Sequence, residues 1–251
     1  MILPTTLPLA LPAFALAFAM TFGAAAIRGL TGFGMAIILV PLLGLIIAPA
    51  QAVIVAIVLQ LLIGPVGIRK IIADAERRSA LTIAAYAVLA TPLGLWLLKL
   101  TSPDLARLII ALVAIGAFLL VLLPSTPGRK PGRVETGLTG IASGILTGFA
   151  AMPGPPVVPY YLRRKLPPQV TRASMMLVFF VTAIAGTLSA FALGVASTRL
   201  LWLSLLLFPA VLAGNWLGGL AFGRISETLW RSFVAVVLGI AGVAAVVRLL
   251  T

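Results

Sequence analysis

The sequence predicts an all-α integral membrane protein with two inverted-topology repeats and about eight to ten membrane segments, two of them broken or half-helices. Three observations support this fold class: a very apolar composition, a series of apolar runs joined by short basic loops, and residues that recur in the same order in both halves. Together they describe a chain whose surface faces lipid and whose halves are related.

The composition leaves too few charges for a water-facing surface. Hydrophobic residues make up 62% of the 251 residues and charged residues 9%, and the mean hydropathy is +1.22. Soluble domains carry about 25% charged residues, so most of this surface must face lipid. The first 13 residues contain no basic residue, unlike a cleaved signal peptide, and we expect residues 7–27 to form the first membrane segment.

Ten apolar runs are candidates for helical segments, five in each half. They cover about residues 7–27, 33–48, 50–68, 80–98, 104–123, 137–151, 154–162, 169–193, 200–222 and 229–250. Two of them, 33–48 and 154–162, are short for a bilayer core of about 30 Å. Each follows a Gly- or Pro-rich break, so we expect half-helices or arms of hairpins that turn within the membrane.

A Pro-, Gly- and Arg-rich stretch divides the chain, because it cannot continue a helix. We therefore expect a first transmembrane repeat at 1–123, a basic linker at 124–136 and a second transmembrane repeat at 137–251.

The two halves share ordered matches. Pro41, Pro49 and Gln51 recur at the same spacing as Pro159, Pro167 and Gln169; Thr31-Gly32-Phe33 recurs as Thr147-Gly148-Phe149; and Gly94, Ser102, Leu105 and Arg107 recur as Gly218, Ser226, Leu229 and Arg231. Internal repeats of this kind are typical of secondary transporters.

The basic residues predict an orientation. The chain has 18 Lys and Arg against 5 Asp and Glu, a net charge of +13. If each copy contributes five segments, an odd number, the second copy enters from the opposite face. One face then receives Arg69, Lys70, Arg77, Arg78, Arg129, Lys130, Arg133, Arg163, Arg164, Lys165 and Arg224, and the other only Lys99, Arg107, Arg199 and Arg248. The positive-inside rule puts the rich face in the cytoplasm and both termini outside, in the periplasm. Because these charges lie in short loops between apolar runs, they indicate topology and argue against a nucleic-acid partner.

The first candidate site is the break Arg28-Gly29-Leu30-Thr31-Gly32-Phe33-Gly34, whose three glycines weaken a helix. Such a break is tolerated at membrane depth only beside protein or a water-filled cavity. The half-helix that starts after Gly34 would direct free N–H groups and a partial positive charge into that cavity, a ready anion site. Arg28 could add a fixed charge. The structural alternatives are close helix packing and an arginine that reaches a lipid headgroup.

The second candidate site is the break from Thr147 to Pro156. Pro153-Gly154-Pro155-Pro156 cannot sit in a regular helix interior, and we expect Pro155 and Pro156 to open the next half-helix. The alternative is a loop at the membrane surface, but the flanks offer water no polar side chain except Ser143 and Thr147. Paired broken segments are the best sequence pointer to a transport site.

The remaining polar residues narrow the chemistry. Gln60 and Asn215 lie inside predicted spans, where a buried amide needs a partner, either a ligand or another helix. The sequence has no His and no Cys, and its five acidic residues fall in loops or at segment ends. The sequence therefore lacks the residues needed for a metal site, for a proton relay, or for catalysis by paired carboxylates, a Ser-His pair or a Cys nucleophile. We expect no catalytic residues, no metal and no cofactor.

The two breaks resemble the repeated motifs of a known family. Gly29 to Gly34 followed by Val40-Pro41, and Gly148 through Gly154-Pro155-Pro156-Val157-Val158-Pro159-Tyr160, are similar to the paired motifs of the TauE/SafE family. The resemblance covers nearly the whole chain. It implies a bacterial inner-membrane exporter or permease for sulfite, sulfonates such as sulfoacetate, thiosulfate or related organic acids. Many members carry Gly-Gly-Gly in the first motif, whereas Phe33 interrupts it here, which leaves the substrate open.

We therefore expect a secondary transporter, an exporter of small anions such as sulfite and sulfonates, that works by alternating access around a midplane site. Its partners would be the anion and the lipid bilayer, and a homodimer is compatible with the sequence. The expected substrate-binding residues are Arg28, Thr31, Gly32, Phe33, Gly34, Gln60, Thr147, Gly148, Pro153, Gly154, Pro155, Arg172 and Asn215. The alternatives are an anion channel, separated by saturation and counterflow, and a non-transport protein such as an assembly factor or intramembrane enzyme. The last would need a polar or acidic cluster at one membrane face, which the sequence does not reveal.

Overall fold

The computed structural model describes residues 8–122, 131–164 and 166–220, and within them every regular element is a helix. In chain order these are α1 (Leu11–Thr31), α2 (Met35–Leu43), α3 (Pro49–Ile63), α4 (Ile68–Asp74), α5 (Arg77–Leu100), α6 (Pro103–Leu122), α7 (Arg133–Ala150), α8 (Gly154–Leu162), α9 (Pro168–Ala192) and α10 (Thr198–Leu220). The predicted all-α fold class is confirmed. The predicted segment at 229–250 lies outside the described residues.

The described helices suit a bilayer. α1, α5, α9 and α10 are each long and apolar enough to cross a membrane, and α3 with α4 is a further candidate, bent by 83°. α2 and α8 contain nine residues each, about 14 Å of helix, which is less than half of a bilayer core. The two predicted short segments are therefore present as short helices.

Several boundaries differ from the prediction. α1 runs from Leu11 to Thr31, so Arg28 to Thr31 of the predicted first break are helical. The apolar run at 50–68 stops being one helix at Ile63, because Pro65 has no N–H to donate and Gly67 has a left-handed φ of 75°. α7 begins at Arg133, so the last four residues of the predicted linker are helical. Glu135 stands in the first turn of α7, where a negative charge suits the helix dipole.

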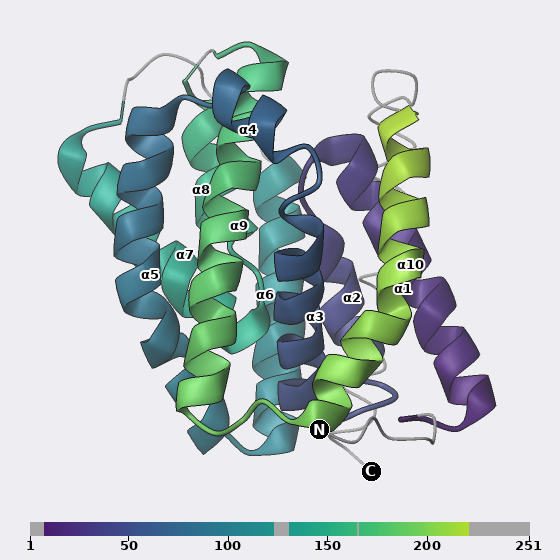
Figure 1. The fold of residues 1–251 in the computed structure, drawn as a ribbon. Coiled ribbons are helices and arrows are strands. Elements are labelled where there is room, and N and C mark those ends of the chain that lie inside the picture. Colours follow the sequence, from purple (N-terminus) through teal and green to yellow (C-terminus); the bar gives the residue numbers. More distant parts are fainter. Residues whose placement is uncertain (1–7, 123–130, 165, 221–251) are drawn as a thin grey trace.

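Figure 1 shows α5 and α7 on one side of the bundle, α1 and α10 on the other, and α3 and α9 between them. Glycines bring each outer pair together. An added Cβ at Gly148 would overlap the backbone of α5, and one at Gly214 or Gly218 would overlap the backbone of α1. Small residues allow such close approach between membrane helices. If α1 corresponds to α7 and α5 to α10, each pair maps onto the other, although the inverted repeat itself stays a prediction.

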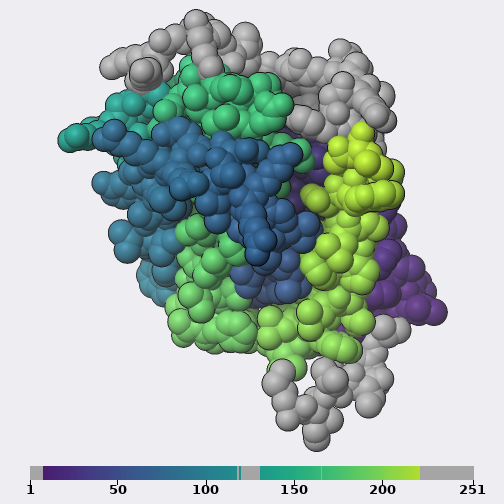
Figure 2. All heavy atoms as spheres, turned by 45° about the horizontal axis from the view of Figure 1, so that its top comes forward, coloured from purple at the N-terminus to yellow at the C-terminus, as the bar shows by residue number. Residues whose placement is uncertain are grey.

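Basic residues gather at one end of the bundle, at the top of Figure 1, on α4, the first turns of α5 and α7 and the end of α8. Figure 2 looks onto this end and shows the α4–α5 segment, in blue, beside the α8–α9 segment, in green. We call it the basic end. It holds Arg69, Lys70, Arg77, Arg78, Arg133, Arg163 and Arg164, whereas Lys99, Arg107 and Arg199 lie on elements at the other end.

Candidate functional site

The two chain breaks lie against each other inside the bundle and enclose a small cavity. It is lined by Arg28 of α1, residues 33–37 of the first break and α2, Gln60 of α3, residues 152–154 of the second break, and Phe179 of α9. Gln60 and Phe179 each lie eleven residues from the start of helices that run in opposite directions (Figure 1). Eleven residues rise about 16 Å, so the cavity lies roughly midway between the two ends of the bundle.

The first break is a glycine turn. Gly32 and Gly34 have φ values of 85° and 90°, in the left-handed region that only glycine adopts easily. The Thr31 hydroxyl lies 2.8 Å from the Ile27 carbonyl oxygen and accepts a hydrogen bond from the Phe33 N–H at 3.2 Å. The Thr31 side chain therefore links the end of α1 to the turn and stabilises the turn.

The start of α2 points its donors at the cavity. Met35, Ala36 and Ile37 form its first turn and line the cavity. The first four N–H groups of a helix have no partner within it, and no side chain caps α2. These N–H groups, with the positive end of the helix dipole, make this wall electropositive.

The second break is closed by side chains that bind its carbonyl groups. Ala151 follows α7 with φ of 57°, and its carbonyl oxygen accepts a hydrogen bond from Gln60 Nε2 at 3.0 Å. The Pro153 carbonyl oxygen accepts one from Ser143 Oγ at 3.1 Å. α8 then begins at Gly154, and Pro155 and Pro156 in its first turn have no N–H. This break thus offers fewer donors than the first.

Arg28 brings a full charge to the cavity wall. The residue is only 7% exposed, and its Nη1 donates to Asn215 Oδ1 of α10 at 2.8 Å. No carboxylate among the described residues forms an ion pair with it. Asn215 holds this guanidinium group in place through a neutral amide, so no described residue cancels its positive charge.

Arg172 of α9 contacts the first break but is not among the residues that line the cavity. Its Nη2 donates to the Gly29 carbonyl oxygen at 2.6 Å, where a cation suits the C-terminal end of the α1 dipole. Its aliphatic stem packs against Gly32, where an added Cβ would overlap Cγ. Arg172 therefore supports the turn rather than lining the cavity.

The thirteen predicted site residues fall into three groups. Those that line the cavity are Arg28, Phe33, Gly34, Gln60, Pro153 and Gly154. Those that do not line the cavity but form or support the first break, or bind Arg28, are Thr31, Gly32, Arg172 and Asn215. Thr147, Gly148 and Pro155 are buried but do not line the cavity.

Thr147 and Gly148 lie inside α7, although the sequence match with Thr31 and Gly32 puts them at the break. Thr147 donates to the Ser143 carbonyl oxygen within its own helix at 2.7 Å, and Gly148 packs against α5. α7 continues to Ala150 because the nearest obstacle is Pro153, which disfavours helical backbone at the residue before it. The break therefore comes three residues later than the match implies.

Sequence reasoning missed other lining residues. Met35 to Ile37 follow from the rule that a helix start exposes its donors. Met152 and Phe179 also line the cavity, but apolar residues in an apolar span carry no signal. Ser143 was noted only as a polar flank, and its bond to Pro153 could not be seen from spacing.

The cavity is small. Its volume is about 20 Å³, room for about one water molecule. Any larger anion must displace part of the lining. Within the described ranges, no three His, Cys, Asp or Glu side chains come together as a metal site would need.

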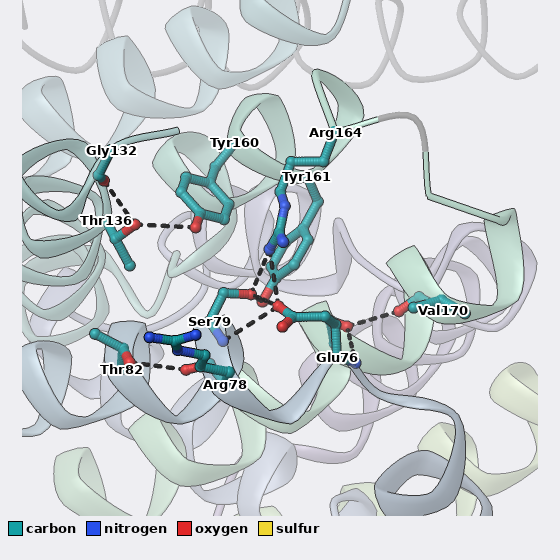
Figure 3. A network of polar contacts seen from close by, with 11 residues as sticks. Glu76, Arg78, Ser79, Thr82, Gly132, Thr136, Tyr160, Tyr161, Arg164 and Val170 are labelled. Atoms are coloured by element: carbon teal, nitrogen blue, oxygen red, sulfur yellow. Dashed lines mark hydrogen bonds and ion pairs between the residues drawn. The ribbon is translucent and has the colours of Figure 1, made fainter. Parts of the chain in front are cut away.

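The sequence reveals no polar or acidic cluster at one membrane face, but the structure contains one at the basic end (Figure 3). Arg164 Nη1 lies 2.8 Å from a Glu76 carboxylate oxygen and 2.7 Å from Ser79 Oγ. Ser79 also contacts the Glu76 carboxylate and lies 2.9 Å from the Tyr161 hydroxyl. Burial raises the pKa of the Glu76 carboxyl, but the hydrogen bonds from Ser79 and Arg164 outweigh it, and the pKa lies below its ordinary value.

Comparison with known proteins identifies the family. No curated protein and no solved structure matches the chain. The family model described as sulfite exporter TauE/SafE matches residues 17–245, which include both breaks, the central cavity and the cluster at the basic end. The chain is therefore a multi-pass membrane protein that belongs to the TauE/SafE sulfite exporter family.

Proposed function

We propose that this protein is a secondary transporter that exports small anions such as sulfite, sulfonates or related organic acids, bound in the central cavity. One observation carries the proposal: the first turn of α2 and the Arg28 guanidinium group face the same buried cavity, and no described carboxylate pairs with Arg28. Membership of a transporter family supports a transport role and is consistent with a chain that is not an enzyme.

The electrostatics favour an anion over a cation. Charges interact more strongly in a buried, low-dielectric site than in water. A helix N-terminus together with a buried arginine would bind an oxyanion through charge-assisted hydrogen bonds. A sulfite or sulfonate head group, with several oxygens around one centre, could accept from both walls at once.

Alternating access fits the size and position of the cavity better than a channel. A channel needs a continuous pore, whereas this cavity has room for about one water molecule. The first residues of α2 and of α8 both line the cavity, so movement of either short helix would open it toward one end of the bundle. Saturable uptake with counterflow in proteoliposomes is the expected result, and linear, non-saturating flux would favour a channel.

The proposed orientation places the basic end in the cytoplasm. The chain has no cysteine, so single cysteines report accessibility cleanly. Lys70→Cys lies at the basic end and Ser102→Cys at the other, and both positions are exposed. In intact cells, an impermeant maleimide should label Ser102→Cys and not Lys70→Cys. The reverse pattern would invert the orientation.

The decisive binding experiment is a thermal-shift screen of purified protein against sulfite, sulfate, thiosulfate, sulfonates and carboxylates. Arg28→Gln removes the charge, and Arg28→Lys keeps it as the matched control. A charged hydrogen bond contributes about 1.5–3 kcal/mol, so Arg28→Gln should weaken binding about tenfold to a hundredfold, with less loss in Arg28→Lys. Equal binding by wild type and Arg28→Gln would remove Arg28 from the site.

A further inference from the structure

A second, larger cavity opens at the basic end. Its volume is about 390 Å³, within the range of about 300–1,000 Å³ that is usual for small-molecule sites. The first turns of α5 and α7 and the last turns of α8 line it. Tyr160 on its wall lies six residues along α8 from Gly154, about 9 Å of helix. This cavity and the central one therefore lie at opposite ends of the same short helix.

The charge of this cavity is strongly positive. Arg78, Arg133 and Arg164 line it, against a single carboxylate, that of Glu76. Glu76 is already paired with Arg164 at 2.8 Å. In the part of the chain that the structure describes, the side chains of Arg78 and Arg133 form no hydrogen bond or ion pair. Within the described residues, these two positive charges have no protein counter-charge.

Backbone dipoles add to this charge. α5 begins at Arg77 and α7 at Arg133, and both helix starts border the cavity. The start of α7 follows Gly132, which has no side chain to cap its free N–H groups. The start of α5 is capped by Glu76, whose carboxylate accepts a hydrogen bond from the Ser79 N–H at 3.1 Å. The uncapped start of α7 and the unpaired guanidinium groups of Arg78 and Arg133 therefore supply the positive field of the cavity.

The floor is polar, buried and held in place (Figure 3). Ser79, Thr136 and Tyr160 are 7%, 7% and 4% exposed. The Tyr160 hydroxyl lies 3.0 Å from Thr136 Oγ1. The Arg164 guanidinium is fixed by Glu76 and lies 5.7 Å from the centre of the Tyr160 ring. A site whose donors are already positioned loses less free energy when it orders around a ligand.

We propose that this cavity is a second anion site, which binds the oxyanion head of a small organic anion between Arg78, Arg133 and Arg164. The volume exceeds what a bare inorganic anion fills, and the partly exposed Tyr86 ring on its wall would contact an organic substituent. Two sources supply this chemistry: a soluble sulfonate, or the phosphate ester of an anionic lipid headgroup.

Calorimetric titration of the full-length protein in a neutral detergent with ethanesulfonate tests this proposal. The variant Arg78→Gln/Arg133→Gln removes the two unpaired charges, and the matched control Arg69→Gln/Lys70→Gln removes two exposed charges of α4 that do not line the cavity. We expect the first variant to lose one equivalent of binding, or to weaken it about tenfold or more. The control should bind as wild type does.

The central site is tested separately by Arg28→Gln. If both sites exist, the wild type binds two equivalents and each variant loses a different one. If only the proposed function fails, the wild type binds one equivalent, which Arg28→Gln retains and Arg78→Gln/Arg133→Gln loses. Unchanged stoichiometry and affinity in Arg78→Gln/Arg133→Gln, or the same loss in the α4 control, would overturn the second site. Equal unfolding temperatures without anion exclude misfolding as the cause.

Nanodiscs distinguish the two sources. A soluble-anion site binds ethanesulfonate equally in phosphatidylcholine discs and in discs that also contain phosphatidylglycerol. A headgroup site loses that equivalent only in the phosphatidylglycerol discs, and native mass spectrometry should then show more phosphatidylglycerol on wild type than on Arg78→Gln/Arg133→Gln.

Discussion

The two chain breaks that enclose the central cavity are built differently. The first turns on two glycines of positive φ, Gly32 and Gly34, and leads into a helix whose first turn presents free N–H groups. The second turns on Ala151, is bound by Gln60 and Ser143, and leads into a helix that starts with prolines. The first break supplies donors and conformational freedom, whereas the second supplies a fixed wall.

This difference shows that equivalent places in two halves need not share a task. Pro155 and Pro156 start α8 well because their φ already suits a helix, but they remove two of the donors that α2 keeps. An anion bound between the breaks would therefore be held mainly from the α2 and Arg28 side. Substitutions in the two breaks should therefore have effects of different kinds as well as of different sizes.

The largest effect is expected for Gly32→Val. Its backbone is left-handed, and an added Cβ would overlap Arg172 Cγ, which would pull Arg172 from the Gly29 carbonyl oxygen. We expect a stability loss of about 2 kcal/mol or more and no sulfite transport in proteoliposomes. Gly23→Val is the control, since an added Cβ there has no neighbour within 4 Å. Normal transport by Gly32→Val would mean that the turn is not needed.

Alanine substitutions at Gly34 and at Gly154 should separate backbone strain in the first break from loss of space in the cavity. Gly34→Ala places a side chain at φ of 90° and should lower stability by about 1–2 kcal/mol. Gly154→Ala meets Phe179 and Val158 at 3.8 Å, an ordinary contact, and should leave the unfolding temperature unchanged. Its methyl group would still fill space in a cavity of about 20 Å³, so anion binding should fall. If both variants lose stability equally, the two breaks are not different in the way described.

A smaller effect is expected for Ser143→Ala, which removes the hydrogen bond to the Pro153 carbonyl oxygen in the second break. The loss should be about 1 kcal/mol, measured by thermal unfolding. Ser189→Ala is the matched control, because the Ser189 hydroxyl donates only to Ala185 within its own helix. Equal loss in the two variants would show that Ser143 does not hold the break.

The smallest effect concerns acid. The pKa of Glu76 lies below its ordinary value of 4.5, so its carboxylate stabilises the folded state above that pH. The stabilisation is lost as the pH falls through the lower, folded-state pKa. Unfolding temperatures of wild type and Glu76→Gln should therefore differ at pH 6 and converge in the acid range. A difference that stays constant down to pH 3 would contradict this assignment.

The sequence was sufficient to predict the all-α membrane class and the two short helices. These follow from composition, from Gly and Pro positions and from helix length, all of which are local. The position at which the second break begins could not be predicted. Thr147-Gly148 has the same residues as Thr31-Gly32, but in the structure the helix continues through it. Helix ends depend on which backbone groups find partners, and here Gln60, distant in sequence, is one of them.

The cavity at the basic end was not predicted, for a related reason. Its charges were interpreted only as topology signals, which accounts for Arg78, Arg133 and Arg164 one at a time. What joins them is the parallel packing of α5 and α7, whose first turns lie at the same end of the bundle beside the end of α8. This is a tertiary arrangement. The neighbouring Tyr160-Tyr161 and Arg163-Arg164 pairs were the only local hint.

The glycine seams have a mechanical consequence. Where α5 meets α7 and α1 meets α10, backbone touches backbone, so neither pair can slide without a clash between main chains. α3 and α9 instead meet through side chains: an added Cβ at Gly186 would lie 3.0 Å from the Ile57 side chain, and one at Gly64 would overlap the Phe180 ring. Side chains can change rotamer, whereas backbones cannot yield. We therefore expect two stiff blocks that rock about the α3–α9 contact, with the first break acting as the joint.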